Sequence, residues 1–343
     1  MLEIPSDKTQ LELELFKGWF AAQANQSQTV ELFDAMPKYV FDRHAKATKA
    51  VEFIRRTFVH KSVEYGLRIT PAIIERGGEA WGVYPGVREE IVVRTILHMA
   101  VQQLAQLKLG EDKDGNVLIG ASFTLSQLRK HLSAAGRKYS VVQIDEAIRV
   151  CRLSSLDLQC EAGGKKGVIS SGIFMTYSAV DEDVRNKDGD RSYRYVVFNP
   201  LITRSILEKT FRPINYERLM SLGSPLARWL YDRLSHNFRQ AEKSGAINNV
   251  GYHISLETIL RESGITKEER LRNNIAAIRT ALTQLKEQGV LSRINPYQEN
   301  LKYGPKSKGP APVIGAVWVL FPSAAVVDEI IEGNRSTKSN RPS

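Results

Sequence analysis

The amino-acid sequence predicts an α+β protein with two tandem domains of similar design and an N-terminal arm. Three observations lead to this prediction. Helix-like and strand-like segments alternate along the 343 residues. One order of elements, a pair of helices followed by a β-hairpin, occurs twice. Short sequence matches also fall at nearly the same spacing in the two copies, as an internal duplication requires.

The composition is typical of a globular protein and carries a basic excess. Hydrophobic residues make up 42% of the chain, and 48 Lys and Arg against 38 Asp and Glu give a formal charge of +10. This excess favours a polyanionic partner, because cations placed near phosphates release condensed counterions. The longest apolar stretch, 313–327, is too short to span a membrane. With no signal-peptide pattern at the start of the chain, we expect a cytoplasmic protein without a membrane partner.

The first copy of the repeated pattern is expected in a domain at 51–212, after a partly ordered arm at 1–50. A helix pair and a β-hairpin in that order form the winged-helix layout, in which a small sheet backs the two helices. Hydrophobic periodicity and turn residues give the expected elements. They are strands at 53–59 and 67–74, a helix at 88–107, the helix pair at 127–132 and 140–153, and strands at 156–160, 167–180 and 192–199.

The second copy is expected at 213–325 and is followed by a C-terminal tail at 326–343. Its expected elements are a helix at 216–238, a strand at 253–255, the helix pair at 256–262 and 267–287, and strands at 290–295 and 313–321. Phe123-Thr124-Leu125 matches Ile254-Ser255-Leu256, and Ala147-Ile148-Arg149 matches Ala277-Ile278-Arg279. The offsets are 131 and 130 residues, so the spacing within the two copies agrees to within one residue. The sequence therefore predicts two tandem winged-helix domains.

The helix at 267–287 has the pattern of a helix that reads DNA. Its leucines and isoleucines form one stripe that must pack on a core. The opposite face offers small residues that permit close approach to base edges, and Asn, Arg and Thr side chains that can recognise them. Base contacts usually cluster in the first half of such a helix. Together with flanking cations, the predicted DNA-binding residues are Lys267, Arg270, Arg272, Asn273, Asn274, Ala277, Arg279, Thr280, Lys302, Lys306 and Lys308.

Charge distribution favours this interpretation over a merely solvated helix face. Residues 261–310 contain ten Lys and Arg but only five Glu, so about half of the charge excess of the chain lies in fifty residues. The loop at 302–308 lies where the wing of a winged helix would reach flanking phosphates.

Several segments of this sequence resemble the TrfA-type (RepA-like) initiator proteins of iteron-bearing plasmids. The matching segments are Tyr216–Leu219, Ser224–Tyr231, Ser255–Thr258, Leu285–Leu291 and, more loosely, Phe123–Leu128 and 144–153. The resemblance implies two winged helices that bind double-stranded DNA at repeated origin sites as monomers, with dimers formed through the first domain. It also implies that binding opens A+T-rich DNA and recruits host replication proteins such as the helicase. The second domain would then make the main DNA contact and the first a secondary one.

The same resemblance suggests that the arm binds the replicative sliding clamp. Some members of the family carry a Gln-Leu-Ser/Asp-Leu-Phe peptide, and the candidate here is Gln28, Leu32 and Phe33. The spacing departs from the family pattern, because Gln28 lies one residue too far from the Leu-Phe pair. The alternative is a hydrophobic anchor that packs on the first domain.

The sequence gives no indication of catalysis, so we expect no catalytic residues, no metal and no cofactor. None of the six histidines has another histidine two residues away, as a nicking enzyme requires, and no His/Cys spacing suits zinc. Cys151 and Cys160 are too few for a disulfide framework. Gly163-Gly164-Lys165-Lys166 lacks the spacing and the Ser or Thr of a phosphate-binding loop. Two alternatives to an initiator remain: a transcriptional repressor with the same scaffold, and a protein whose winged helices bind other proteins.

Overall fold

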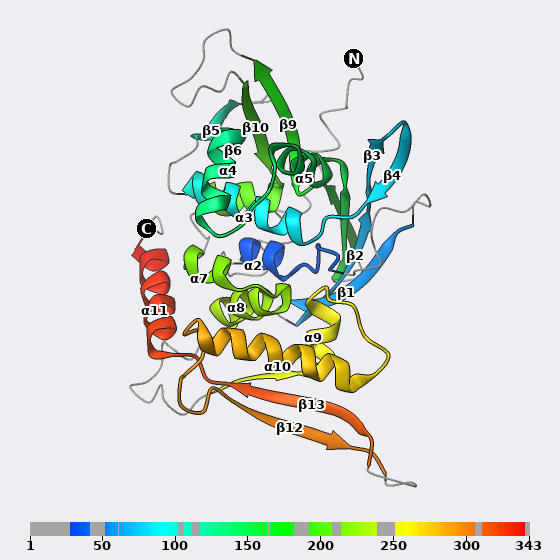
Figure 1. Ribbon diagram of the computed structural model, residues 1–343, viewed down its shortest axis with the longest axis vertical. Coiled ribbons are helices and arrows are strands. Elements are labelled where there is room, and N and C mark those ends of the chain that lie inside the picture. The colour runs from blue at the N-terminus through cyan, green and yellow to red at the C-terminus, as the bar shows by residue number, and fades with distance from the viewer. Residues whose placement is uncertain are drawn as a thin grey trace. The chain divides into compact units, whose positions relative to one another are not determined.

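The computed structural model describes residues 28–41, 52–60, 62–101, 106–111, 117–162, 165–181, 192–207, 214–238, 251–305 and 311–339. The chain divides into two compact units, which we call unit 1 (residues 1–211) and unit 2 (residues 212–343). Both units combine helices with antiparallel sheets (Figure 1), which confirms the predicted α+β composition. No helix in the described part of the chain is both long and apolar enough to cross a membrane.

Unit 1 contains two four-stranded antiparallel sheets, ordered β1-β2-β7-β8 and β5-β6-β10-β9, and a separate β3-β4 hairpin. Its helices are α2 (Gln28–Ala35), α3 (Val87–Val101), α4 (Leu125–Ala134), α5 (Val141–Leu153) and α6 (Pro200–Leu207). Its strands are β1 (Ile54–His60), β2 (Val63–Thr70), β3 (Ala72–Arg76), β4 (Glu79–Val83), β5 (Gln106–Glu111), β6 (Val117–Thr124), β7 (Ser155–Ala162), β8 (Lys165–Ser171), β9 (Phe174–Asp181) and β10 (Ser192–Phe198).

The sequence prediction for unit 1 is wrong at four places. The expected strand 167–180 is divided between β8 and β9, which belong to different sheets. The expected strand 67–74 is divided between β2 and β3, which belong to different sheets. The expected helix 88–107 ends at Val101, and residues from Gln106 onward form β5, a strand whose polar and apolar residues also fit a helix face. The expected arm contributes α2, which packs against α6 and β1 and so belongs to unit 1.

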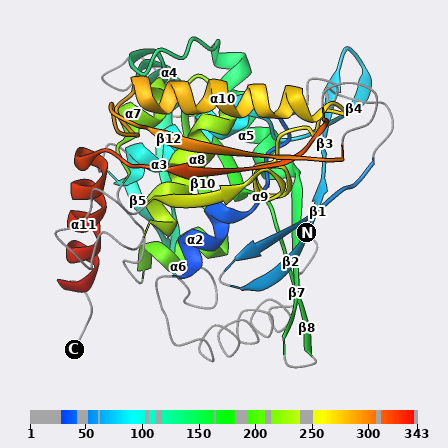
Figure 2. The same cartoon turned by 90° about the horizontal axis from the view of Figure 1, so that it is seen from below.

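Unit 2 is built from a bundle of helices and one three-stranded antiparallel sheet ordered β11-β13-β12. Its helices are α7 (Tyr216–Ser221), α8 (Pro225–Asn237), α9 (Leu256–Glu262), α10 (Leu271–Glu287) and α11 (Ala324–Ser339). Its strands are β11 (Tyr252–Ser255), β12 (Tyr297–Tyr303) and β13 (Val313–Leu320). Figure 1 shows α10 between α8 and the β12–β13 hairpin, and α10 packs on both α8 and β13. Figure 2 shows the same hairpin running along α10.

The two units share a strand–helix–helix segment at the residues that match in sequence. In unit 1, β6 leads into α4 and then α5; in unit 2, β11 leads into α9 and then α10. Each short helix starts with a hydroxyl cap, because Thr124 accepts from the Gln127 N–H and Ser255 accepts from the Thr258 N–H. Such caps satisfy amides that the helix itself leaves unpaired. The internal match therefore corresponds to the same local structure.

One core holds unit 2 together. Residues from α8, α9, α10, β13 and α11 meet in it, and Trp318 of β13 is fully buried among them. At the end of α10, Gly289 has a φ of 67°, a left-handed conformation that suits glycine. The N–H of Val290 then donates to the carbonyl of Leu285 at 2.8 Å, which closes the helix and turns Val290 and Leu291 into the core.

Three elements of unit 2 differ from the prediction. The expected helix 216–238 is two helices, since the chain leaves α7 at Leu222 and Pro225 starts α8. The expected strand 290–295 is not a regular strand. Val290 and Leu291 are buried in the core, and Asn295 has a left-handed φ of 50°. The strand β12 follows it instead. Its alternating pattern was missed because only Tyr297 and Leu301 mark its partly buried side.

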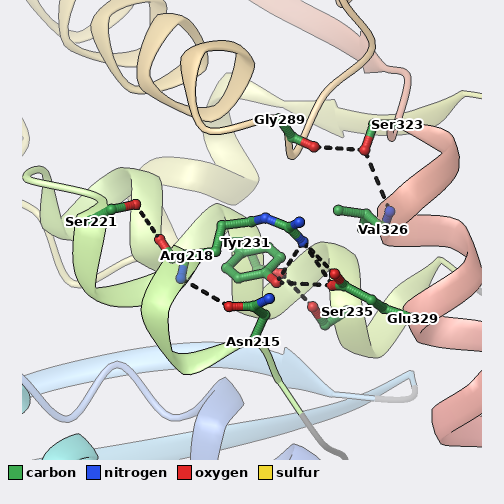
Figure 3. Close-up of polar contacts among 9 residues, drawn as sticks. All are labelled: Asn215, Arg218, Ser221, Tyr231, Ser235, Gly289, Ser323, Val326 and Glu329. Carbon is green, nitrogen blue, oxygen red and sulfur yellow. Dashed lines mark hydrogen bonds and ion pairs between the residues drawn. The ribbon is translucent and has the colours of Figure 1, made fainter. Parts of the chain in front are cut away.

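The C-terminal segment expected to be a tail from 326 onward instead forms most of α11. Its side chains Val326, Val327 and Ile330 are buried in the core of unit 2. Figure 3 shows the polar contacts at the same place: Arg218 of α7 donates to both carboxylate oxygens of Glu329, at 2.8 and 2.7 Å. Just before α11, the Ser323 hydroxyl donates to the Gly289 carbonyl at 2.6 Å. The tail was missed because its apolar run is short and polar residues follow it.

Candidate nucleic-acid interface

Helix α10 has one buried side and one exposed side, as the stripe of leucines and isoleucines predicts. Ile275, Ile278, Leu282 and Leu285 are buried in the core of unit 2, and Ala281 lies with them. This packing fixes which side of the helix faces outward. The exposed residues of α10 are Arg272, Asn273, Ala276, Ala277, Arg279, Thr280, Thr283, Lys286 and Glu287.

Most of the predicted DNA-binding residues lie on or beside this exposed side. Arg272, Asn273, Ala277, Arg279 and Thr280 are exposed on α10 itself. Lys267 and Arg270 are exposed in the segment before the helix, and Lys302 is exposed on β12. Lys306 and Lys308 lie outside the described residues.

The threonine hydroxyls of the exposed side bond to carbonyls of the same helix. Thr280 donates its hydroxyl to the Ala276 carbonyl at 3.1 Å, and Thr283 donates to the Arg279 carbonyl at 3.0 Å. Because these hydroxyls are satisfied within the helix, the polar reading groups of the exposed side are Arg272, Asn273 and Arg279.

Asn274 is not part of this exposed side, and its selection from the sequence is wrong. Asn274 is only 1% exposed. The Oδ1 atom accepts from the Glu268 N–H at 2.9 Å, and the Nδ2 atom donates to the Glu268 carbonyl at 2.8 Å. The side chain thus holds the chain segment that leads into α10. Asn273, its neighbour, is exposed instead, because successive residues of a helix are rotated by about 100° around its axis.

The second half of α10 is tied to the loop between α7 and α8. Gln284 accepts from the Ser224 N–H at 2.9 Å, and Ser221 bonds with Gln288 at 2.8 Å. The same loop is supported from within, because the fully buried Arg228 donates to the carbonyls of Leu222 and Gly223. These contacts occupy the end of α10 and leave its first half as the freer surface.

An ion pair joins α10 to the sheet of unit 2. Arg279 Nε donates to Glu299 Oε1 at 3.0 Å, and Arg279 Nη2 donates to Glu299 Oε2 at 2.5 Å. The indole N–H of Trp318 also donates to Glu299 Oε1, at 2.9 Å. The hydrogen bond from Arg279 lowers the pKa of Glu299, so this carboxylate is charged near neutral pH. Glu299 was not singled out from the sequence. The sequence signal that could have identified it is its position in β12, where it alternates with exposed residues and shares a side with Tyr297 and Leu301.

The counterpart of α10 in unit 1 does not present a comparable surface. The β3–β4 hairpin and β9 pack on α5, and Val150 of α5 shares a core with Ile74 and Val83. The outer acids of α5 are also engaged. Glu146 accepts from Arg76 and Arg88 at 2.8 Å each. The residues of α5 that stay exposed are Val142, Gln143, Arg149, Arg152 and Leu153. The first half of this side lacks the cations and small residues that the first half of α10 presents.

The neighbouring acid Asp145 is engaged as well. It accepts from Arg149 Nε at 2.7 Å and bonds with the hydroxyl of Tyr177. Partial burial acts to raise the pKa of Asp145, but these hydrogen bonds outweigh it and lower the pKa. The carboxylate therefore stays charged and bonded within unit 1.

The residues proposed for clamp binding are mostly enclosed in unit 1. Leu32 and Phe33 of α2 are 1% and 2% exposed, and the Lys38 ammonium lies 4.1 Å from the centre of the Phe33 ring. A clamp pocket needs these side chains to be exposed, so binding would require α2 to detach. The structure supports the alternative of a hydrophobic anchor. The side chain of Gln28 lies outside the described residues.

Nothing in the described part of the chain gathers three or more His, Cys, Asp or Glu side chains into an arrangement that could hold a metal ion. Both cysteines are free and buried, and burial raises the pKa of Cys160 to about 11. Such thiols are poor nucleophiles, because the thiolate is the reactive form.

Comparison with known proteins gives a likeness of fold and no likeness of sequence. No protein-family model matches the chain, and no curated protein matches it. Among solved structures, domains 2 and 3 of RctB have a TM-score of 0.50 at 13% identity, covering 86% of this chain and 97% of that one. A second structure of the same RctB domains gives a TM-score of 0.44 at 12% identity, covering 87% and 98%. The structure of Pi initiator protein in complex with iteron DNA has a TM-score of 0.36 at 10% identity, covering 68% of this chain and 94% of that one. This chain shares the fold of RctB domains 2 and 3.

Proposed function

We propose that this chain is a sequence-specific double-stranded DNA-binding protein that initiates replication at an origin with repeated sites. The observation that carries the proposal is the exposed side of α10, where Arg272, Asn273 and Arg279 stand around the small residues Ala276 and Ala277. Arginine and asparagine can form paired hydrogen bonds with guanine and adenine, and alanines let a helix approach base edges closely.

Unit 2 serves as a winged helix in this proposal. Helices α9 and α10 form the helix pair, the sheet β11-β13-β12 backs it, and the β12–β13 hairpin is the wing. Arg272, Asn273, Ala277, Arg279 and Thr280 read base edges. The cations around them, Lys267, Arg270, Lys302, Lys306 and Lys308, contact phosphates, which fix the register of the helix on the duplex.

The first turn of α10 supplies a further phosphate site within the same interface. Arg270 occupies the N-cap position but forms no side-chain capping bond. A DNA phosphate can take the place of the missing cap, since helix N-termini attract anions. Asn274 supports this arrangement by holding residue 268 in place, two positions before Arg270.

The role in replication rests on the resemblance of the sequence to TrfA-type initiators. By that resemblance the protein binds origin repeats as a monomer, dimerises through unit 1, and recruits host replication proteins. It has no catalytic chemistry of its own, so origin opening uses binding energy and host factors. The acids Asp145 and Glu146 in the first half of α5 argue that any DNA contact of unit 1 involves residues outside this part of the helix.

A plasmid replication assay combined with DNA binding tests the proposal. Footprinting on DNA next to the gene of this protein should reveal repeated protected sites. A plasmid that carries this DNA should replicate with the wild-type gene and fail with Asn273→Ala. Arg293→Ala, which removes an exposed cation outside α10, is the matched control and should support replication. Specific binding without replication would instead indicate a transcriptional repressor, and the lack of any preferred duplex would refute DNA reading.

A further inference from the structure

Glu299 is an acid paired with Arg279, on the surface that we propose faces DNA. It belongs to β12, and its partner across the sheet is Trp318 of β13. Its side chain is 17% exposed, whereas the Arg279 side chain that it holds is 50% exposed. An acid at this place repels phosphates, so its presence calls for a role that outweighs the repulsion.

The geometry shows what the carboxylate does to Arg279. Glu299 itself is held by the core of unit 2, because the indole N–H of the buried Trp318 donates to its Oε1 atom at 2.9 Å. Its two oxygens then take the Nε and Nη2 donors of Arg279, at 3.0 and 2.5 Å. A paired contact between a planar guanidinium and a carboxylate defines the plane and the direction of the arginine. The flexible side chain is thereby held in one orientation before any ligand arrives.

The arginine keeps donors for a second partner. A guanidinium has five N–H donors, and the paired contact with Glu299 uses two of them, one on Nε and one on Nη2. The remaining three lie on Nη1 and Nη2, at the end of the side chain. Two such donors suffice for the paired contact with the O6 and N7 atoms of guanine.

We propose that Glu299 is a positioning residue for base recognition, which holds Arg279 on the exposed side of α10 with its end donors available to a guanine. The same contact couples the β12–β13 hairpin to α10, so that the two DNA-facing elements keep one relative arrangement. This inference rests on the proposed function of unit 2. It assigns Glu299 no direct contact with DNA.

The inference makes a prediction opposite in sign to that of simple electrostatics. Glu299→Gln removes a negative charge from the surface, and charge alone would then strengthen binding to every duplex. If Glu299 positions Arg279, the same variant must weaken binding to the preferred duplex, because Arg279 loses its orientation. Glu287→Gln is the matched control, since it removes an exposed acid from α10, the helix that carries Arg279.

The experiment measures binding of the full chain to two probes by fluorescence anisotropy. One is the duplex that the wild-type protein selects from a random-sequence pool, and the other is a scrambled duplex of the same composition. We expect Glu299→Gln to lower the preference for the selected duplex by about fivefold or more, the size of one lost base contact. Glu287→Gln should leave the preference unchanged. In the Arg279→Ala background, Glu299→Gln should have no further effect on the preference, because the residue acts through that arginine.

Arg279→Lys is a second variant that does not depend on the stability of the sheet. It keeps the charge and loses the paired contact, so it should lower the preference as Glu299→Gln does. Tighter binding of Glu299→Gln to both probes would overturn the inference and leave the proposed function intact, as would an unchanged preference in Arg279→Lys. Failure of the wild-type protein to select any duplex would overturn both.

Discussion

Replacing Asn274 by alanine should destabilise unit 2, whereas the same change at Asn273 should leave its stability nearly unchanged and weaken DNA binding. The two asparagines are adjacent in sequence, and the structure gives them opposite environments. Asn274 is buried and forms two hydrogen bonds with the backbone of Glu268, while Asn273 is exposed on α10. The pair therefore tests the assignment of structural and DNA-reading roles with one kind of substitution.

The magnitude follows from the two hydrogen bonds. Each contributes about 1 kcal/mol to the free energy of unfolding. Alanine is a better helix former than asparagine by about 0.5 kcal/mol, which offsets part of the loss. Asn274→Ala should therefore cost roughly 1.5 kcal/mol, or about 4–9 °C in Tm for a unit of this size. Asn273→Ala should change the free energy of unfolding by at most about 0.5 kcal/mol.

Two measurements check this prediction. Thermal unfolding of the full chain, followed by circular dichroism, gives the change in Tm. Binding to the preferred and scrambled duplexes gives the change in base preference, for which Asn273→Ala should cost about 1–3 kcal/mol at the preferred site. The assignment is refuted if Asn274→Ala retains the wild-type Tm and alters the preferred sequence, while Asn273→Ala binds as the wild type does.

Three further predictions concern the wing, the ion pair and the C-terminal helix. Lys302→Ala should weaken binding to all duplexes similarly and reduce the slope of log affinity against log salt by about 1; a change confined to the preferred duplex would contradict a phosphate contact. The pKa of Glu299 is lowered in the folded protein by the hydrogen bond from Arg279. The stabilising contribution of Glu299 is therefore present above the ordinary pKa of a glutamate and is lost as pH falls through the folded pKa. On acidification, the free energy of unfolding should therefore fall less for Glu299→Gln than for the wild type. Curves of unfolding free energy against pH that run parallel for the two proteins would contradict this. Ile330→Ala should reduce the free energy of unfolding by about 2–4 kcal/mol, as urea denaturation would measure; an effect below about 0.5 kcal/mol would show that α11 is not part of the core.

The sequence was most informative where a regular pattern repeats over several turns. The spacing of Leu271, Ile275, Ile278, Leu282 and Leu285 predicted the buried side of α10, and four of these five residues are indeed buried. The internal match predicted that a pair of helices would recur, and α4–α5 and α9–α10 are such pairs. The strand that precedes each pair was not predicted in the first copy.

Features that depend on tertiary contacts could not be predicted in this way. Asn274 lies at the edge of the polar face, and only the contact with Glu268 decides that it faces inward. The burial of Leu32 and Phe33 could not be predicted because α6, the helix that packs on α2, lies far along the chain. Glu299 is one acid in a polar strand until the sheet places it between Trp318 and Arg279.

The difference between the exposed sides of α5 and α10 has a consequence for how the protein would find its target. If only α10 inserts into the major groove, one molecule inspects a short stretch of bases, and each mismatch costs about 1–3 kcal/mol. So short a site recurs by chance in any long genome. Discrimination would then come from several molecules bound side by side, and the number and spacing of repeats would matter as much as the sequence of each one.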